Sequence, residues 1–118
     1  MLALTSGKQI RVYLEPIDFR YGIHGLICLL IQELKEDPKT GDYFIFTNKR
    51  KDRVKILFWD NSGFVLYYKQ LAQGRFCYSK YLEGNEILIN EIQLKALLRG
   101  LDFHRFMEDA YDDMKDFL

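Results

Sequence analysis

Residues 43 to 82 contain four short strand-like segments separated by turn sequences, and this pattern is the strongest constraint on the fold. The segments are Tyr43–Thr47, Arg53–Asp60, Phe64–Leu71 and Arg75–Leu82. The connections Asn61-Ser62-Gly63 and Ala72-Gln73-Gly74 each supply a glycine for the positive φ angle of a tight hairpin turn. Strands joined by such short connections run antiparallel, because a parallel pair needs a long crossover. The region therefore predicts an antiparallel β-meander.

The residues before the meander predict a strand and then an amphipathic helix. Between Gln9 and Glu15, apolar and polar residues alternate, and Pro16 ends this strand pattern. From Ile23 to Leu34 the apolar residues recur at helical spacing, which predicts a helix near residues 22–36 that ends before Asp37-Pro38.

The residues after the meander predict one more strand and one or two helices. Glu86–Ile89 is a short strand candidate, and Asn90 with Gln93 forms a capping pair for a helix near residues 90–99. Residues 101–118 contain six acidic and two basic side chains among regularly spaced apolar ones. This segment is predicted to be an acidic, amphipathic helical extension at about 104–118.

These elements fit a single α+β domain. The chain has 118 residues, of which 48% are hydrophobic and 15% aromatic, so one hydrophobic core is expected and disorder is not. We expect residues 1–118 to form an antiparallel meander of about five strands, with both helices on one face of the sheet. No apolar stretch is long enough for a membrane helix, two cysteines cannot form a dense disulfide framework, and the expected localisation is cytoplasmic.

The net charge of zero conceals an uneven distribution of charge. Between Thr47 and Arg75 there are seven basic and two acidic residues. If the strands alternate, Arg53 and Lys55 share one face of the sheet with Trp59, and Lys49-Arg50-Lys51 form a basic turn beside it. Basic side chains interleaved with aromatic ones on an exposed sheet face favour contact with a nucleic acid. Alternatively, these lysines and arginines only solvate a loop and protect a sheet edge.

The sequence contains none of the common signatures of catalysis or metal binding. A phosphate-binding glycine loop, a His-Glu-x-x-His motif and a Cys-x-x-Cys motif are all absent, so we predict neither an enzyme nor a cofactor. Four carboxylates could in principle gather around magnesium, as a nuclease requires, although each occupies a position where a turn or cap favours an aspartate. They are Asp18, Asp42, Asp52 and Asp60.

A series of short motifs, in order and with compatible spacing over about residues 5 to 103, resembles one protein family. The motifs are Asp18-Phe19-Arg20-Tyr21-Gly22, Gly25-Leu26, Asp37-Pro38, Gly41, Phe44-Ile45-Phe46, the run Asn48 to Asp60, Gly63, Lys69-Gln70-Leu71, Gly74-Arg75-Phe76 and Leu97-Leu98-Arg99-Gly100-Leu101-Asp102. The chain resembles the Orf2-like accessory proteins (TnpB) of bacterial insertion sequences of family sixty-six.

The resemblance implies a small protein that is needed for efficient transposition and has no established catalytic activity. It implies two partner proteins, a separate transposase and a second small accessory protein. The basic positions that recur in the family correspond here to Arg20, Lys49, Arg50, Arg53, Lys55, Lys69 and Arg75. These residues coincide with the charge cluster found independently.

Together these observations predict a non-catalytic accessory protein of DNA transposition. We expect the basic sheet face to bind the phosphate backbone of the element's DNA, alone or in the transposase–DNA complex. Charge reversal at Arg53 and Lys55 should then weaken DNA binding without disturbing the fold. The alternative is an adaptor that binds the transposase or the other accessory protein without contacting DNA, through the same face or through the acidic segment from Asp109 to Phe117.

Overall fold

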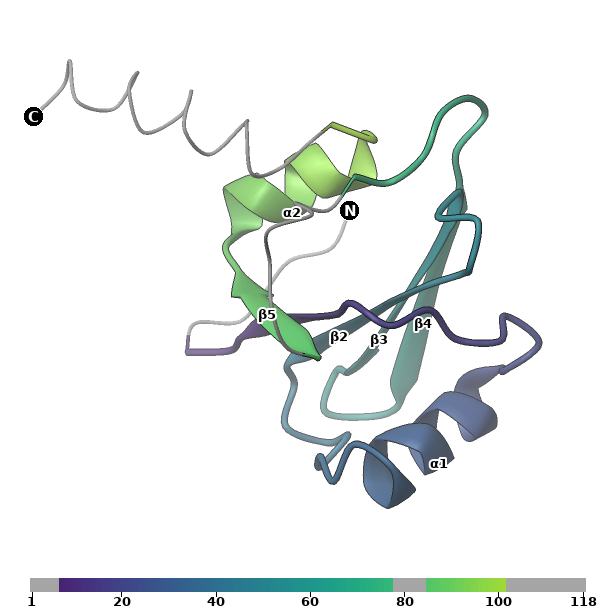
Figure 1. The fold of residues 1–118 in the computed structure, drawn as a ribbon. Helices are drawn as coiled ribbons and strands as arrows, with labels where there is room; N and C mark the ends of the chain where they lie inside the picture. Colours follow the sequence, from purple (N-terminus) through teal and green to yellow (C-terminus); the bar gives the residue numbers. More distant parts are fainter. Residues whose placement is uncertain (1–6, 78–84, 102–118) are drawn as a thin grey trace, which may run out of the picture.

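The computed structural model describes residues 7–77 and 85–101, which form one five-stranded sheet with a helix against each of its faces (Figure 1). The elements are β1 (Ile10–Tyr13), α1 (Ile23–Gln32), β2 (Tyr43–Thr47), β3 (Arg53–Trp59), β4 (Phe64–Gln70), β5 (Glu86–Ile89) and α2 (Glu91–Leu98). The predicted α+β class and the number of strands are confirmed.

The sheet is mixed rather than wholly antiparallel. Its strand order is β4-β3-β2-β1-β5, and β2, β3 and β4 form the predicted antiparallel meander. β1 lies between β2 and β5, parallel to β2 and antiparallel to β5. The reason is that the long connection from β1 to β2 contains α1, and such a crossover brings the chain back to start a parallel strand.

The predicted strand Arg75–Leu82 does not form over the part that the structure describes. Residues 75–77 have no regular secondary structure. Instead, Phe76 is buried in the core, and its backbone N–H donates to the carbonyl oxygen of Lys51 at 2.6 Å. Residues 78–82 and the predicted helical extension at about 104–118 lie outside the described residues.

The two helices cover opposite faces of the sheet, which corrects the prediction that they share one face (Figure 1). Leu94, Ala96 and Leu97 of α2 pack with Val54 and Ile56 of β3 in one buried cluster. On the other face, the side chains of α1 pack against a second buried cluster. The buried members of this second cluster are Tyr13, Leu26, Leu30, Phe44, Phe46 and Leu57. Because both faces of the central strands are apolar, both need a helix to exclude water.

Helix α1 ends at Gln32, four residues before the end predicted from the apolar spacing. The N–H groups of Glu33 and Leu34 both donate to the carbonyl oxygen of Leu29, and Lys35 has a positive φ of 57° that turns the chain away. Of the two helices described, neither has the length and apolar character needed to cross a membrane.

Helix α2 begins with the predicted capping pair. The side-chain oxygen of Asn90 accepts a hydrogen bond from the backbone N–H of Gln93 at 2.8 Å, and the Gln93 side chain accepts one from the backbone N–H of Asn90 at 2.6 Å. Both bonds satisfy N–H groups that the first turn of a helix leaves without partners.

We expect Asn90→Ala to lower the free energy of unfolding by about 1 kcal/mol, because the N–H of Gln93 loses its acceptor. Urea unfolding followed by circular dichroism measures this change. Asn90→Asp is the control and should keep most of the stability, since aspartate caps a helix as well as asparagine. An Asn90→Ala protein as stable as the native chain would show that the cap contributes nothing.

Candidate functional site

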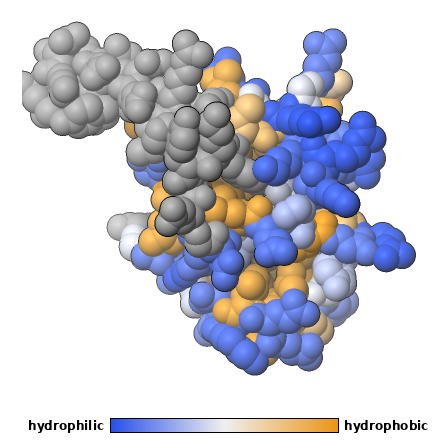
Figure 2. Space-filling model, in the orientation of Figure 1, coloured by the Kyte–Doolittle hydropathy of each residue, from blue (hydrophilic) through white to orange (hydrophobic). Residues whose placement is uncertain are grey.

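Five of the seven basic residues predicted to bind nucleic acid lie at one end of the sheet, which we call the basic end. Lys49 and Arg50 lie in the loop between β2 and β3, and Arg53 begins β3. Lys69 lies near the end of β4, and Arg75 lies in the segment that follows it. Figure 2 shows a hydrophilic region over this end of the molecule, at the upper right of the view.

Asn48 holds the β2–β3 loop in shape. Its side-chain oxygen accepts hydrogen bonds from the backbone N–H groups of Asp52 at 3.1 Å and Arg53 at 3.0 Å. Its side-chain nitrogen donates to the carboxylate of Asp52 at 2.6 Å. Because Lys51 adopts a left-handed backbone with φ of 60°, the loop turns within a few residues. The local sequence therefore presents Lys49 and Arg50 on a fixed turn.

The segment after β4 is attached to the same loop. The backbone N–H of Leu71 donates to the carbonyl oxygen of Asp52 at 2.8 Å, and that of Phe76 donates to the carbonyl oxygen of Lys51 at 2.6 Å. Burial of the Phe76 ring in the core fixes the segment further. These contacts bring Arg75 beside the basic turn, although the two are more than twenty residues apart in the sequence.

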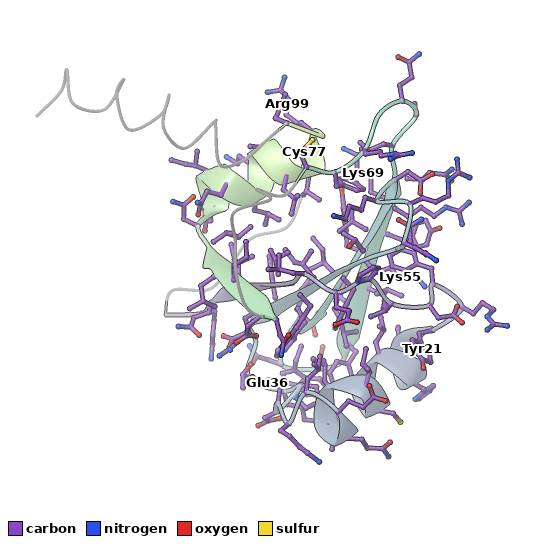
Figure 3. The ribbon with its side chains drawn as sticks, in the orientation of Figure 1. Tyr21, Glu36, Lys55, Lys69, Cys77 and Arg99 are labelled. Carbon is purple, nitrogen blue, oxygen red and sulfur yellow. The ribbon has the colours of Figure 1, made fainter. Side chains whose placement is uncertain are left out.

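The end of α2 adds Arg99, which the sequence analysis did not include. A Cβ atom built on Gly100 would lie 3.3 Å from the Leu71 side chain and 3.7 Å from the carbonyl oxygen of Arg75, so the end of α2 touches the segment after β4. Arg99 and Lys69 lie at the same end of the molecule in Figure 3. The sequence signal for Arg99 was its position next to Gly100, a glycine that can end a helix. In the structure Gly100 has a φ of +76° and ends α2.

The basic end is the rim of the sheet and not one of its faces. Lys69 is paired in register with Val54, and Arg53 is paired with Gln70. Since Val54 points into the core under α2, Lys69 is on the α2 side, and Arg53 is on the opposite side. The prediction that these cations share one exposed face of the sheet is therefore wrong, because Lys69 and Arg53 lie on opposite sides and Lys55 is buried.

The cations of the basic end are exposed or half-buried, and they have no acidic partner in the part of the chain that the structure describes. Within the described residues, no carboxylate lies within 4.0 Å of the charged groups of Arg50, Arg53 or Arg75, nor of Lys49, Lys69 or Arg99. Asp52 lies among them, and the hydrogen bond from Asn48, with the positive charges of Arg50 and Arg53, lowers its pKa. The end as a whole keeps a strong positive charge at neutral pH.

Lys55 is not part of this exposed surface. Its side chain follows the predicted strand alternation, but that face is covered, and Lys55 is only 5% exposed. Its Nζ donates to the backbone carbonyl oxygens of Phe19 at 2.8 Å and Tyr21 at 2.6 Å, and lies 5.4 Å from the centre of the Tyr68 ring. Burial lowers the pKa of Lys55, and the negative charge of Asp18 opposes that shift. The residue fastens the loop before α1 to the sheet (Figure 3).

Arg20 lies in the loop that Lys55 fastens, and it has a carboxylate partner. Its guanidinium is 91% exposed and donates to the carboxylate of Asp18 at 2.6 Å. The hydrogen bonds from the side chain and backbone of Arg20 lower the pKa of Asp18 to about 2. Arg20 is therefore locally neutralised, unlike the cations of the basic end.

The four aspartates considered as magnesium ligands have separate local roles. Asp18 binds Arg20, Asp52 binds Asn48, Asp60 accepts hydrogen bonds from Ser62 and Gly63 in its own turn, and Asp42 binds Gln9 and Arg11. Over residues 7–77 and 85–101, no three acidic, histidine or cysteine side chains form a group that could hold a metal ion.

Comparison with known proteins identifies the family. The family model described as IS66 Orf2-like protein matches residues 8–108. Two relatives come from Sinorhizobium fredii (strain NBRC 101917 / NGR234) and are named uncharacterized proteins y4jC and y4hO. The first is 36% identical over 105 residues, covering 89% of each chain, and the second is 33% identical over 107 residues, covering 89% of this chain and 92% of the relative.

No solved structure is significantly similar to the chain. The family match spans both helices and all five strands of the sheet, and it includes every residue of the basic end. The family is not a known class of enzyme. The chain belongs to the IS66 Orf2-like family, whose members have an accessory role in transposition.

Proposed function

We propose that this protein takes part in transposition as a non-catalytic component that binds DNA through its basic end. The observation that carries the proposal is the convergence of cations from separate parts of the chain, none of which has an acidic partner among residues 7–77 and 85–101. The β2–β3 loop, β4, the segment after β4 and the end of α2 each contribute at least one lysine or arginine. The whole chain has no net charge, so the positive charge of this end results from the way the chain folds.

The arrangement suits the phosphate backbone better than the base edges. The cations are distributed along a rim, and within the described residues neither α1 nor α2 projects from it as a helix that could enter the major groove. Lysine and arginine side chains spread over a convex surface give affinity through phosphate contacts, with little reading of sequence. The DNA is that of the mobile element, alone or held by the transposase.

The test is binding of the purified chain to labelled element-end DNA and to an unrelated duplex across a salt titration. If about five phosphates are contacted, the logarithm of the association constant should fall against the logarithm of salt concentration with a slope of about −4.5. We expect similar affinity for both duplexes. A preference for the element ends would indicate base reading as well.

Failure to bind either duplex at low salt would contradict the proposal. That result would favour the alternative, an adaptor that acts only through protein contacts with the transposase or the second accessory protein. A pull-down of those two proteins in the presence of nuclease would then test the adaptor directly.

A further inference from the structure

A groove lies beside the side of α1 that faces away from solvent. Acidic side chains line this groove, whereas the basic end is positively charged. Two adjoining hollows of about 370 Å³ and 340 Å³ share Tyr13, Glu33, Leu34 and Asn85 as lining residues. We call them together the acidic groove. Tyr21 and Glu36, which lie near the two ends of α1 in Figure 3, also line it.

The groove combines acidic side chains with an apolar lining. Five carboxylates line it: those of Glu15, Asp18, Glu33, Glu36 and Glu86. Its apolar lining includes Pro16, Ile17, Leu29, Leu34 and Phe46. Among the described residues that line the groove, none is a lysine, arginine or histidine.

One half-buried cation contacts the acidic side chains of the groove, and it does not balance their negative charge. The guanidinium of Arg11 contacts the carboxylates of Asp42 at 3.3 Å, Glu86 at 3.3 Å and Glu36 at 3.5 Å. One positive charge thus faces three negative ones. Glu15 and Glu33 are exposed and form no ion pair within the described residues, so the groove as a whole is negative.

Two buried polar atoms beside the groove form no hydrogen bond of standard length and angle among the described residues, although the Tyr13 hydroxyl lies close enough to the Glu86 carboxylate for that group to add to the effect of burial in raising the pKa of Tyr13. They are the hydroxyl oxygen of Tyr13, a residue that is only 5% exposed, and Oε2 of Glu86. Burial is the main cause that raises the pKa of Tyr13, and the negative charges of Glu86 and Glu36 raise it further. The Tyr13 hydroxyl therefore stays protonated. A buried polar atom without a partner destabilises the fold, and a ligand that supplies the missing hydrogen bond recovers that loss.

We propose that the acidic groove binds an arginine-containing segment of a partner protein. A guanidinium has five N–H donors, which suit the free oxygen of Glu86 and the carboxylates at the rim. The aliphatic stem of arginine and a neighbouring apolar side chain suit the lining formed by Leu34 and Phe46. None of the cations of the basic end lines the groove, so the two proposed sites use different side chains.

The test uses the full chain and a fluorescein-labelled peptide in which arginines alternate with leucines, measured by fluorescence anisotropy. The double variant Glu15→Gln/Glu33→Gln should weaken peptide binding by about fivefold or more, since it removes two unpaired charges at the rim. Tyr13→Phe should weaken binding by about threefold while changing the urea midpoint little, because the buried ring remains and the hydroxyl forms no hydrogen bond of standard geometry in the free chain.

The control must separate the groove from the acidic C-terminal segment. Asp112→Asn/Asp113→Asn removes the same number of negative charges and should leave peptide binding within about twofold of native. Equal losses in the two double variants would overturn the proposal, as would equal binding of a peptide with glutamine in place of every arginine. A gain in peptide affinity in the variant Lys80→Gln would also overturn the proposal. It would mean that the chain's own Lys80 occupies the groove and competes with the peptide.

The proposal for the acidic groove and the proposal for the basic end can be tested independently. A chain with Arg50→Gln/Arg75→Gln should bind the peptide as the native chain does. If it does not, the peptide binding depends on the overall charge of the chain and the groove is not the site.

Discussion

Replacing Lys55 with glutamate is expected to lower the free energy of unfolding by about 3 kcal/mol or more. The lysine Nζ is buried and donates to two backbone carbonyl oxygens, of Phe19 and Tyr21. A glutamate there would place a desolvated negative charge against two carbonyl oxygens and close to Asp18, and it could donate to neither. The burial of Lys55 therefore replaces the expectation that charge reversal at Arg53 and Lys55 leaves the fold intact.

Urea unfolding followed by the fluorescence of Trp59 measures the effect of Lys55→Glu. The matched control is Lys69→Glu on the neighbouring strand, which should change the free energy of unfolding by no more than about 0.5 kcal/mol because Lys69 is only half-buried and has no hydrogen-bond or ion-pair partner among the described residues. Lys55→Met separates charge from shape and should cost about 1–2 kcal/mol, since the stem remains and two carbonyl groups lose a donor. Equal stability of the two glutamate variants would contradict the clamp role of Lys55.

The case of Lys55 shows what strand periodicity can and cannot predict. The alternation along β3 correctly placed Lys55 on the face opposite Val54 and Ile56. It could not reveal whether that face is exposed, because periodicity reports sidedness and not the cover supplied by other elements. The informative signal was in β2, where Tyr43 to Phe46 are apolar at every position, as in a strand that is buried on both faces.

The strand pairing shows the same limit at longer range. The meander β2-β3-β4 was predictable because each turn lies within a few residues of the strands that it joins. The insertion of β1 between β2 and β5 depends on pairing between residues as distant as Ile10 and Ile89. No local pattern specifies such a contact, so only the existence of β1 and β5, and not their positions, followed from the sequence.

The basic end was partly predictable for a related reason. Lys49, Arg50 and Arg53 are close in the sequence, and a charge count found them directly. Arg99 joins them only because the end of α2 packs on the segment after β4, which no charge count includes. Arg20 was included through the family resemblance, and its partner Asp18, two residues away, was interpreted as a cap or turn residue.

Removing two charges from the basic end should weaken DNA binding strongly and evenly. In Arg50→Gln/Arg75→Gln the two residues come from different segments and are both exposed, so the fold should be kept. If each guanidinium contacts a phosphate, the slope of the salt titration should become less steep by about 2. At 0.1 M salt, a change of that size corresponds to a loss of affinity on the order of 50- to 100-fold. The loss should be the same on element-end and unrelated duplexes, because phosphate contacts carry no base information.

The matched control is Lys8→Gln/Lys39→Gln, which lowers the net charge by the same amount at the other end of the sheet. Lys8 and Trp59 line one hollow there, and the Lys39 ammonium lies 4.9 Å from the centre of the Trp59 ring. Trp59 is the last residue of β3 and Arg53 the first, so the control charges lie roughly 20 Å from the basic end, beyond the screening length of physiological salt. The control should therefore keep nearly native DNA affinity. Equal losses in the two double variants would mean that DNA responds only to net charge, and the basic end would then have no special role.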